Sequence, residues 1–406
     1  MSNLIKKIII LLDLPIDKRL LKLVGAETLI RNGFEVEIWD LTPFFHKELL
    51  DKMVIDGHVV FNKCKKFDNK PEIIESLSKI SPDTIVNLFI AYNLPTNFIY
   101  RHLSKNRIKY CVLQMISFPS PPSRPNGDPV ASLRFLIKKI ISLGPKHAFF
   151  GLCDKLLLRY YRHLGIRPAD IALVSGERSF EIVRDPIDAK THIIWGHIWD
   201  YDNYLAESDI QVIPDPRLGV FLDEYYPLHT DLDYLGISSP IGAEEYYLKL
   251  RTFFDHLEKT YHVRIVIAAH PRSNYPETTH YFGGRPIIKG RTAHIVHESA
   301  FVLAHDSTSI NYAVLFRKPV LFITMNEMQK SDAGRLTTGL SIDSMARFLH
   351  RTPVNIDEAL EFDLTEELKV DEQSYRDYQN AIIKKMGTPE IPFWEIYSQS
   401  IRQMYP

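Results

Sequence analysis

Three short apolar runs between Val263 and Thr324 constrain this chain more than any other feature. They cover Arg264–Ala269, Ala300–Ala304 and Val320–Ile323, and they are rich in Val, Ile, Leu or Phe. Each run has the length of a strand, and helix-like segments separate them. Apolar runs of this length without polar alternation are typical of parallel strands buried on both faces. The stretch therefore predicts part of an open α/β sheet.

Polar residues follow the first run, where the strand is expected to end: His270, Pro271 and Arg272. Ligands of open α/β sheets bind at the carboxyl ends of strands. An imidazole can donate to a phosphate oxygen or a base carbonyl, and a guanidinium can fork onto a phosphate. A strand-ending His beside a surface Arg is the alternative interpretation.

A second polar group follows the run at 300–304 and consists of Asp306, Ser307, Thr308 and Ser309. A helix is expected directly after it. Free backbone N–H groups and the positive end of the helix dipole favour anions at such a position. Ser, Thr and Asp are also preferred helix caps, so plain capping is the alternative. Four polar residues in a row exceed what one cap needs, which favours phosphate binding.

Further candidates stand at the ends of two other segments. Asp223 and Glu224 follow an apolar run and supply carboxylates that could act as a base. Lys289, Arg291 and Thr292 precede a helix-like segment and could hold a base or a ribose.

The first part of the chain begins as a doubly wound domain. A strand at Ile8–Asp13, a helix at Lys18–Asn32 and a strand at Phe34–Trp39 are expected. The glycine fingerprint of a dinucleotide site is missing after the first strand, so bound NAD is not supported. Asp13 ends the apolar run at the amino terminus, which favours a strand over a signal peptide.

We therefore expect two α/β domains. Residues 1–210 form the first, on the acceptor side, and residues 211–386 form the second, which holds the nucleotide donor. Residues 387–406 form a helix that crosses back to the first domain. Segment 196–205 is expected to be a polar loop, although His197, Asp200 and Asp202 have the types of metal ligands. No spacing identifies a metal there.

Residues 131–165 form a basic amphipathic insertion with two helical segments. Two interpretations are open. The segments can be surface helices with a solvated charged face, or they can dock on anionic lipid.

Composition limits the class of partner. The formal net charge is -1 over 406 residues, which argues against nucleic-acid binding as the main role. Three widely spaced cysteines form no disulfide or metal pattern, as expected of a cytoplasmic protein. No stretch has the ~20 apolar residues of a membrane span.

The HP pair at 270–271, the D-S-T-S segment at 306–309 and the A-V-L-x-x-K-P-V turn that follows resemble the nucleotide-binding half of GT-B glycosyltransferases. The likeness covers about residues 218–325 and is greatest to bacterial sialyltransferases and related surface-polysaccharide transferases. Teichoic-acid glycerophosphotransferases, which use a CDP-linked donor, have a similar helix start. The resemblance implies two Rossmann-like domains facing a cleft. It also implies that His270 and Pro271 contact a cytidylate whose phosphate is held by Ser307, Thr308 and Ser309.

The resemblance implies a metal-independent hexosyl- or sialyl-type transferase of capsule or lipopolysaccharide biosynthesis, with no cofactor. A nucleotide sugar, most simply a CMP-linked acidic sugar, is the expected donor, and a glycan, lipid-linked or free, is the acceptor. The expected location is cytoplasmic, including the inner face of the cell membrane. The catalytic base is not carried over, because sialyltransferases follow their acidic pair with Gly, whereas Tyr225 follows Glu224 here. A UDP-sugar transferase, a nucleotide-sugar epimerase of the same fold and a non-catalytic binding protein are the alternatives.

Overall fold

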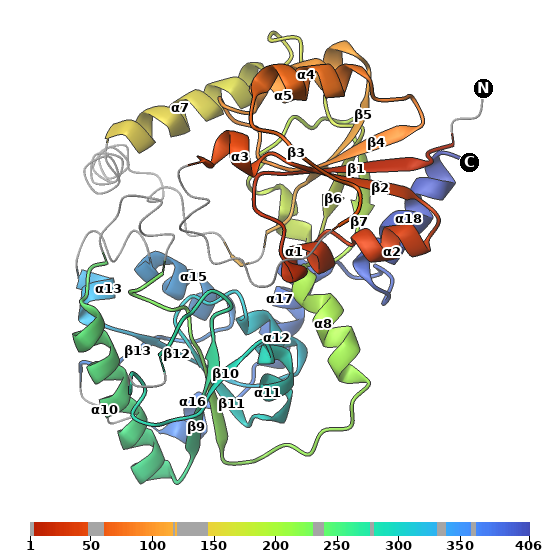
Figure 1. The fold of residues 1–406 in the computed structure, drawn as a ribbon. Helices are drawn as coiled ribbons and strands as arrows, with labels where there is room; N and C mark the ends of the chain where they lie inside the picture. The colour runs from red at the N-terminus through yellow and green to blue at the C-terminus, as the bar shows by residue number, and fades with distance from the viewer. Residues whose placement is uncertain are drawn as a thin grey trace. The chain divides into compact units, whose positions relative to one another are not determined.

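The computed structural model describes residues 4–47, 61–116, 118–119, 145–229, 239–276, 280–330, 338–358 and 363–406. The chain folds into two compact units (Figure 1). The N-terminal unit contains residues up to 116, residues 149–199 and residues 384–406, and residues 200–383 supply most of the C-terminal unit. None of the described helices is long and apolar enough to cross a membrane.

Each unit is built on a sheet in which the described strands pair in parallel. The described strands of the N-terminal sheet have the order β3-β2-β1-β4-β5-β6-β7. They are β1 (Lys7–Leu12), β2 (Glu35–Asp40), β3 (Cys64–Lys66), β4 (Thr84–Phe89), β5 (Lys109–Leu113), β6 (Ile171–Val174) and β7 (His192–Trp195).

The described strands of the C-terminal sheet have the order β10-β9-β8-β11-β12-β13. They are β8 (Leu218–Leu222), β9 (Arg264–Ala269), β10 (Ile287–Lys289), β11 (Phe301–Ala304), β12 (Val320–Thr324) and β13 (Val354–Asn355). This is the doubly wound order, in which the first strand in the sequence, β8, lies inside the sheet and the strands that follow it in the sequence lie on either side. The prediction of two Rossmann-like α/β domains is confirmed.

Helices pack around both sheets. In the first half of the chain they are α1 (Lys18–Leu23), α2 (Ala26–Arg31), α3 (Thr42–Phe45), α4 (Lys70–Ser78), α5 (Asn97–Lys105) and α7 (Pro145–Tyr160). The second half contains α8 (Trp199–Ser208), α10 (Ala243–Tyr261), α11 (Thr292–Glu298), α12 (Ile310–Leu315), α13 (Asn326–Lys330), α15 (Leu340–Phe348), α16 (Leu364–Glu367), α17 (Glu372–Tyr378) and α18 (Phe393–Met404).

The single helix predicted over Lys18–Asn32 is wrong, because two helices, α1 and α2, meet at Gly25. Gly25 has a φ of 67°, in the left-handed region that favours glycine. A Cβ there would collide with the indole of Trp394 in α18. The same indole donates from Nε1 to the Leu23 carbonyl at 2.9 Å. The break in the helix therefore forms the seat of the C-terminal helix on the N-terminal unit.

Other differences concern short or irregular elements. Segment 196–205, expected to be a loop, contains the start of α8. Near the end of the C-terminal unit, α16 and α17 are separate short helices, and a π-helical turn (Gln379–Ile383) follows α17 directly. Strands β3, β10 and β13 were missed because they have only two or three residues, too few to form a recognisable apolar pattern. Most of the predicted segment 131–143 lies outside the described residues.

Candidate active site

Three polar segments meet at the carboxyl edge of the C-terminal sheet. β8 lies between β9 and β11, and Leu222 at its end pairs with one residue of each neighbour. Two residues beyond that level, the three chain segments carry Glu224, His270 and Asp306. The segments after β9 and β11 therefore do not adjoin each other, because the acidic pair after β8 lies between them. The strand order reverses between β8 and β11, which is where doubly wound sheets bind ligands.

Asp223 ties the end of β8 to the segment after β9. It is buried, and its carboxylate accepts hydrogen bonds from the Tyr225 N–H at 3.0 Å, the His270 N–H at 3.3 Å and the Tyr275 hydroxyl at 2.8 Å. Burial raises the pKa of Asp223 to about 6, and these three donors oppose the rise. Both carboxylate oxygens hold neighbouring groups in place, so Asp223 is suited to positioning His270.

Glu224 and Asp306 form a carboxyl pair across β8 and β11. Burial, and then the charge of Asp306, raise the pKa of Glu224 well above its usual range. Burial also raises the pKa of Asp306, against the hydrogen bond that it shares with Glu224. Two carboxylates in contact cannot both ionise easily, so the pair retains one proton near neutral pH. The Oε1 atom of Glu224 is buried and has no hydrogen-bond partner among the described residues.

The His270 ring has a defined orientation. Its Nδ1 atom accepts the Arg272 N–H at 3.2 Å, and the ring packs edge-on against His229 with 4.7 Å between centroids. Because Nδ1 accepts a hydrogen bond, the neutral ring carries its proton on Nε2. Pro271 and Arg272 are exposed beside it. The ring can thus offer an N–H donor at the carboxyl edge.

The D-S-T-S segment precedes α12, all six residues of which are buried. Ser309 occupies the cap position, but its hydroxyl does not cap the helix. The buried Ser307 accepts the Ser309 N–H on its Oγ at 3.3 Å, and Thr308 is exposed. Helix capping therefore does not explain why this segment has three hydroxyl side chains. Phosphate binding by these hydroxyls stays a prediction.

His305 directly precedes the D-S-T-S segment and belongs to the same polar cluster in the sequence, but the structure gives it a supporting position. Its Nδ1 bonds to the Ile323 carbonyl at 2.7 Å and its Nε2 to the Tyr246 hydroxyl at 3.1 Å. Burial lowers the pKa of His305 to about 4. The ring is therefore neutral at physiological pH and has a structural role.

The remaining predicted residues lie at the β10 edge of the sheet. Lys289 donates from Nζ to the Ser273 carbonyl at 3.0 Å and lines a cavity of about 470 Å³. The Tyr275 ring also lines the cavity and connects it to Asp223. Arg291 occupies the N-cap position of α11 without a side-chain capping bond, and Thr292 begins the helix. Within the described part of the chain, no hydrogen bond or ion pair joins these last two to the other candidates.

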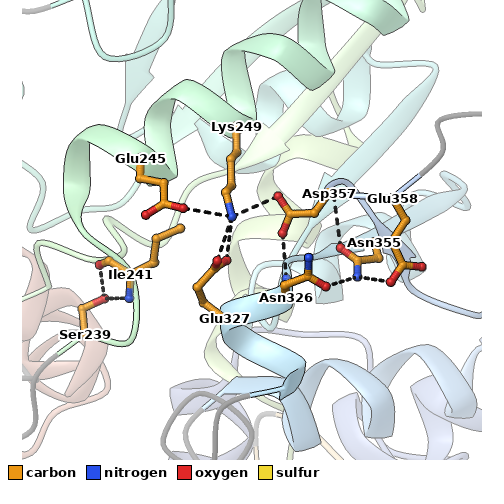
Figure 2. Close-up of polar contacts among 9 residues, drawn as sticks. All are labelled: Ser239, Ile241, Glu245, Lys249, Asn326, Glu327, Asn355, Asp357 and Glu358. Atoms are coloured by element: carbon orange, nitrogen blue, oxygen red, sulfur yellow. Dashed lines mark hydrogen bonds and ion pairs between the residues drawn. The ribbon is translucent and has the colours of Figure 1, made fainter.

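A polar network at the carboxyl ends of β12 and β13 was not anticipated (Figure 2). Lys249 of α10 places its Nζ at 2.8 Å from Glu327, 3.0 Å from Asp357 and 3.3 Å from Glu245. Burial lowers the pKa of Lys249, but the three carboxylates outweigh it and the net effect is a rise. Asp357 also accepts the Asn326 N–H at 2.8 Å.

Only one part of this network could have been found in the sequence. Glu245 and Lys249 are four residues apart in the sequence, which is the spacing of an ion pair on a helix such as α10. Glu327 lies in α13 after β12, and Asp357 lies in the turn after β13. Their approach to Lys249 therefore depends on the tertiary fold.

Two of the side chains near residue 200 that have the types of metal ligands, His197 and Asp200, make hydrogen bonds to other protein groups. His197 is buried, with Nε2 at 3.0 Å from the Ile391 carbonyl. Asp200 accepts from the Asn311 side chain at 2.9 Å. Across the described ranges, no three His, Cys, Asp or Glu side chains are grouped as metal ligands.

No family model and no curated protein sequence matches the chain. Several solved structures are similar at low identity. The chain is 11% identical to UGT89C1 of Arabidopsis thaliana, with a TM-score of 0.47, 98% of this chain covered and 99% of that one. It is 10% identical to MurG of Acinetobacter baumannii, with a TM-score of 0.44, 98% of this chain covered and 100% of that one. It is 10% identical to the UDP-GlcNAc 2-epimerase of Methanocaldococcus jannaschii, with a TM-score of 0.41, 98% of this chain covered and 99% of that one. Likenesses at these TM-scores assign neither a donor nor an activity to the chain.

Proposed function

We propose that the protein is a glycosyltransferase that moves a sugar from a nucleotide donor to a glycan. The main support is that His270, Glu224 and Asp306 follow three neighbouring strands at the same level, where the strand order reverses. This edge combines a positioned N–H donor, hydroxyl groups and a carboxyl pair. A nucleotide sugar needs donors for its phosphate and a carboxylate for its acceptor.

The donor binds along the carboxyl edge of the C-terminal sheet. His270 and Pro271 contact the nucleotide, and Ser307, Thr308 and Ser309 donate to its phosphate. Arg272 stabilises the departing phosphate, the role that a metal has in other transferases. Lys289, Arg291 and Thr292 hold the base or ribose. A CMP-linked acidic sugar is the proposed donor, on the strength of the HP and D-S-T-S motifs.

Glu224 is the proposed base. It takes the proton of the acceptor hydroxyl, whose oxygen bonds to the anomeric carbon while the bond from that carbon to the phosphate oxygen breaks. The nucleotide leaves with the electron pair, and the proton stays on the Glu224–Asp306 pair. Asp223 positions His270 and does not touch the substrate. Because this order of events needs an ionised Glu224, the rate rises with pH through the titration of the pair.

The acceptor is a bacterial surface glycan of the capsule or lipopolysaccharide type, free or linked to lipid at the inner face of the membrane. The N-terminal unit takes the acceptor in this proposal.

The test is donor consumption. The protein is incubated with a CMP-linked acidic sugar, and nucleotide release is followed with and without surface-glycan acceptors. Acceptor-dependent release of CMP together with an extended glycan is expected. Transfer from UDP-sugars alone would replace the donor assignment. Isomerisation of a UDP-N-acetylhexosamine without acceptor would identify an epimerase, and binding without turnover would identify a non-catalytic protein.

A further inference from the structure

Helix α7 presents a row of large apolar side chains to solvent. The exposed fractions are 61% for Phe149, 58% for Leu152, 48% for Leu156 and 45% for Tyr160. The spacing of three, four and four residues places all four on one face of the helix. We call these four residues the α7 stripe. Rows of this kind on a protein surface mark interaction sites, whereas single exposed apolar residues do not.

The opposite face anchors α7 to the N-terminal unit. Leu157 and Leu158 pack on the hydrophobic core that contains Ile99 and Leu103 of α5. Asp154 accepts the Leu94 N–H at 3.1 Å. The helix is labelled in Figure 1, where it extends past α5. Since its core-facing side is already occupied, the α7 stripe is a second apolar face.

Cations border the α7 stripe. Lys155 and Arg159 are exposed, and neither has a carboxylate partner among the residues that the structure describes. The Arg159 guanidinium lies over the Tyr160 ring at 5.7 Å. Asp154 is the only acidic residue in α7, and it is engaged with Leu94. An aromatic and aliphatic face with a basic border is the pattern of helices that lie in the membrane interface.

We propose that α7 docks on an anionic lipid surface, with the α7 stripe at the boundary of headgroups and acyl chains. The positive border complements the negative surface potential of such a membrane. A second copy of the chain fits less well, because a two-fold contact would bring identical cations together. The docking needs no nucleotide, so it stands apart from the proposed transfer reaction.

The test is flotation of the full chain with vesicles of phosphatidylcholine, with and without phosphatidylglycerol. Flotation with the anionic vesicles alone is expected, and it should weaken as salt rises. The double variant Leu152→Glu/Leu156→Glu should abolish it. The double variant Lys155→Gln/Arg159→Gln should weaken binding about thirtyfold, since each cation near the surface contributes about a factor of five.

Two matched controls lie on the same unit. Ile30→Glu changes an apolar residue of α2 that is 48% exposed, and Lys190→Gln removes an exposed cation from a loop. Both should float as the wild type does. Circular dichroism checks that each variant is folded, and the charge variant changes only exposed side chains. Failure of the wild type to float, or unchanged flotation of either double variant, would overturn the proposal. A dimer that Leu152→Glu/Leu156→Glu dissociates would also overturn it, by making the α7 stripe a self-association face.

Discussion

The carboxyl groups of Glu224 and Asp306 contact each other at the point where the strand order of the C-terminal sheet reverses, and the pKa of each is raised. Their backbones come from β8 and β11, which are far apart in sequence and adjacent in the sheet. A half-buried carboxyl pair in contact stabilises its protonated form, so it makes both the stability and the proposed activity depend on pH.

The first prediction concerns stability. The pKa of Glu224 is higher in the folded than in the unfolded chain, so its favourable contribution is present at acid pH and is lost as pH rises through the folded value. Glu224→Gln removes this loss. We expect the variant to be more stable than the wild type at pH 8, by at least about 1 kcal/mol, and the difference to shrink towards pH 5. Thermal unfolding over this range measures it.

A suitable control for that series is Glu27→Gln, which changes an exposed carboxylate at the start of α2. It should show no gain in stability at pH 8. A Glu224→Gln protein that follows the wild-type curve at every pH would contradict the shared proton.

The second prediction separates the two acidic neighbours. As the base, Glu224 affects the chemical step, so Glu224→Gln should lower kcat at least about a hundredfold and change KM little. Asp223→Asn weakens the bonds that hold His270 and Tyr275, so its main effect should be on KM. Steady-state kinetics and the pH profile of kcat distinguish these outcomes. An unchanged kcat in Glu224→Gln would transfer the role of base to another group.

The third prediction concerns the network around Lys249. Lys249→Met leaves three carboxylates without their shared cation, two of them largely shielded from water. We expect a loss of about 2–3 kcal/mol in the free energy of unfolding, because a partly buried charge left unpaired is costly. Lys330→Met is the matched control, since its pair with Glu358 is exposed and 3.5 Å long. It should cost less than about 1 kcal/mol. If urea titrations gave the same loss of unfolding free energy for both variants, the network would contribute no more than an exposed ion pair does.

The fourth prediction tests the seat of the C-terminal helix. Gly25→Ala would force a methyl group into the Trp394 indole at a left-handed position, and should cost more than about 2 kcal/mol. Gly151→Ala is the control within α7, where the new methyl meets open space. It should stabilise the protein by up to about 1 kcal/mol, because Ala favours helix. Differential scanning calorimetry compares the two, and similar melting temperatures would contradict the packing of α18 on α1 and α2.

The long buried elements of the fold were predictable from the sequence. Strand β9 has the predicted bounds, because a continuous apolar run of this length is typical of a strand buried on both faces. The break at Gly25 was not predictable, because its cause is Trp394, which lies 369 positions later in the chain. The two-residue strand β13 pairs only because the sheet presents an edge to it.

The candidate site was predicted as residue types and not as an arrangement. His270 and Asp306 follow two apolar runs of the same stretch, and nothing in that stretch indicates that another strand lies between them. Strand order cannot be read from periodicity, and β8 enters between them from an earlier part of the chain. The pairing of Glu224 with Asp306 follows from that insertion.

Calorimetric titration with CMP tests the central claim most directly, namely that the carboxyl edge of the C-terminal sheet holds a cytidylate. We expect the wild type to bind CMP more tightly than UDP, and His270→Ala to lose at least about tenfold in affinity, as expected for a charge-assisted hydrogen bond. His192→Ala, an exposed ring on the other sheet, should bind as the wild type does. No CMP binding, or unchanged binding in His270→Ala, would contradict the account.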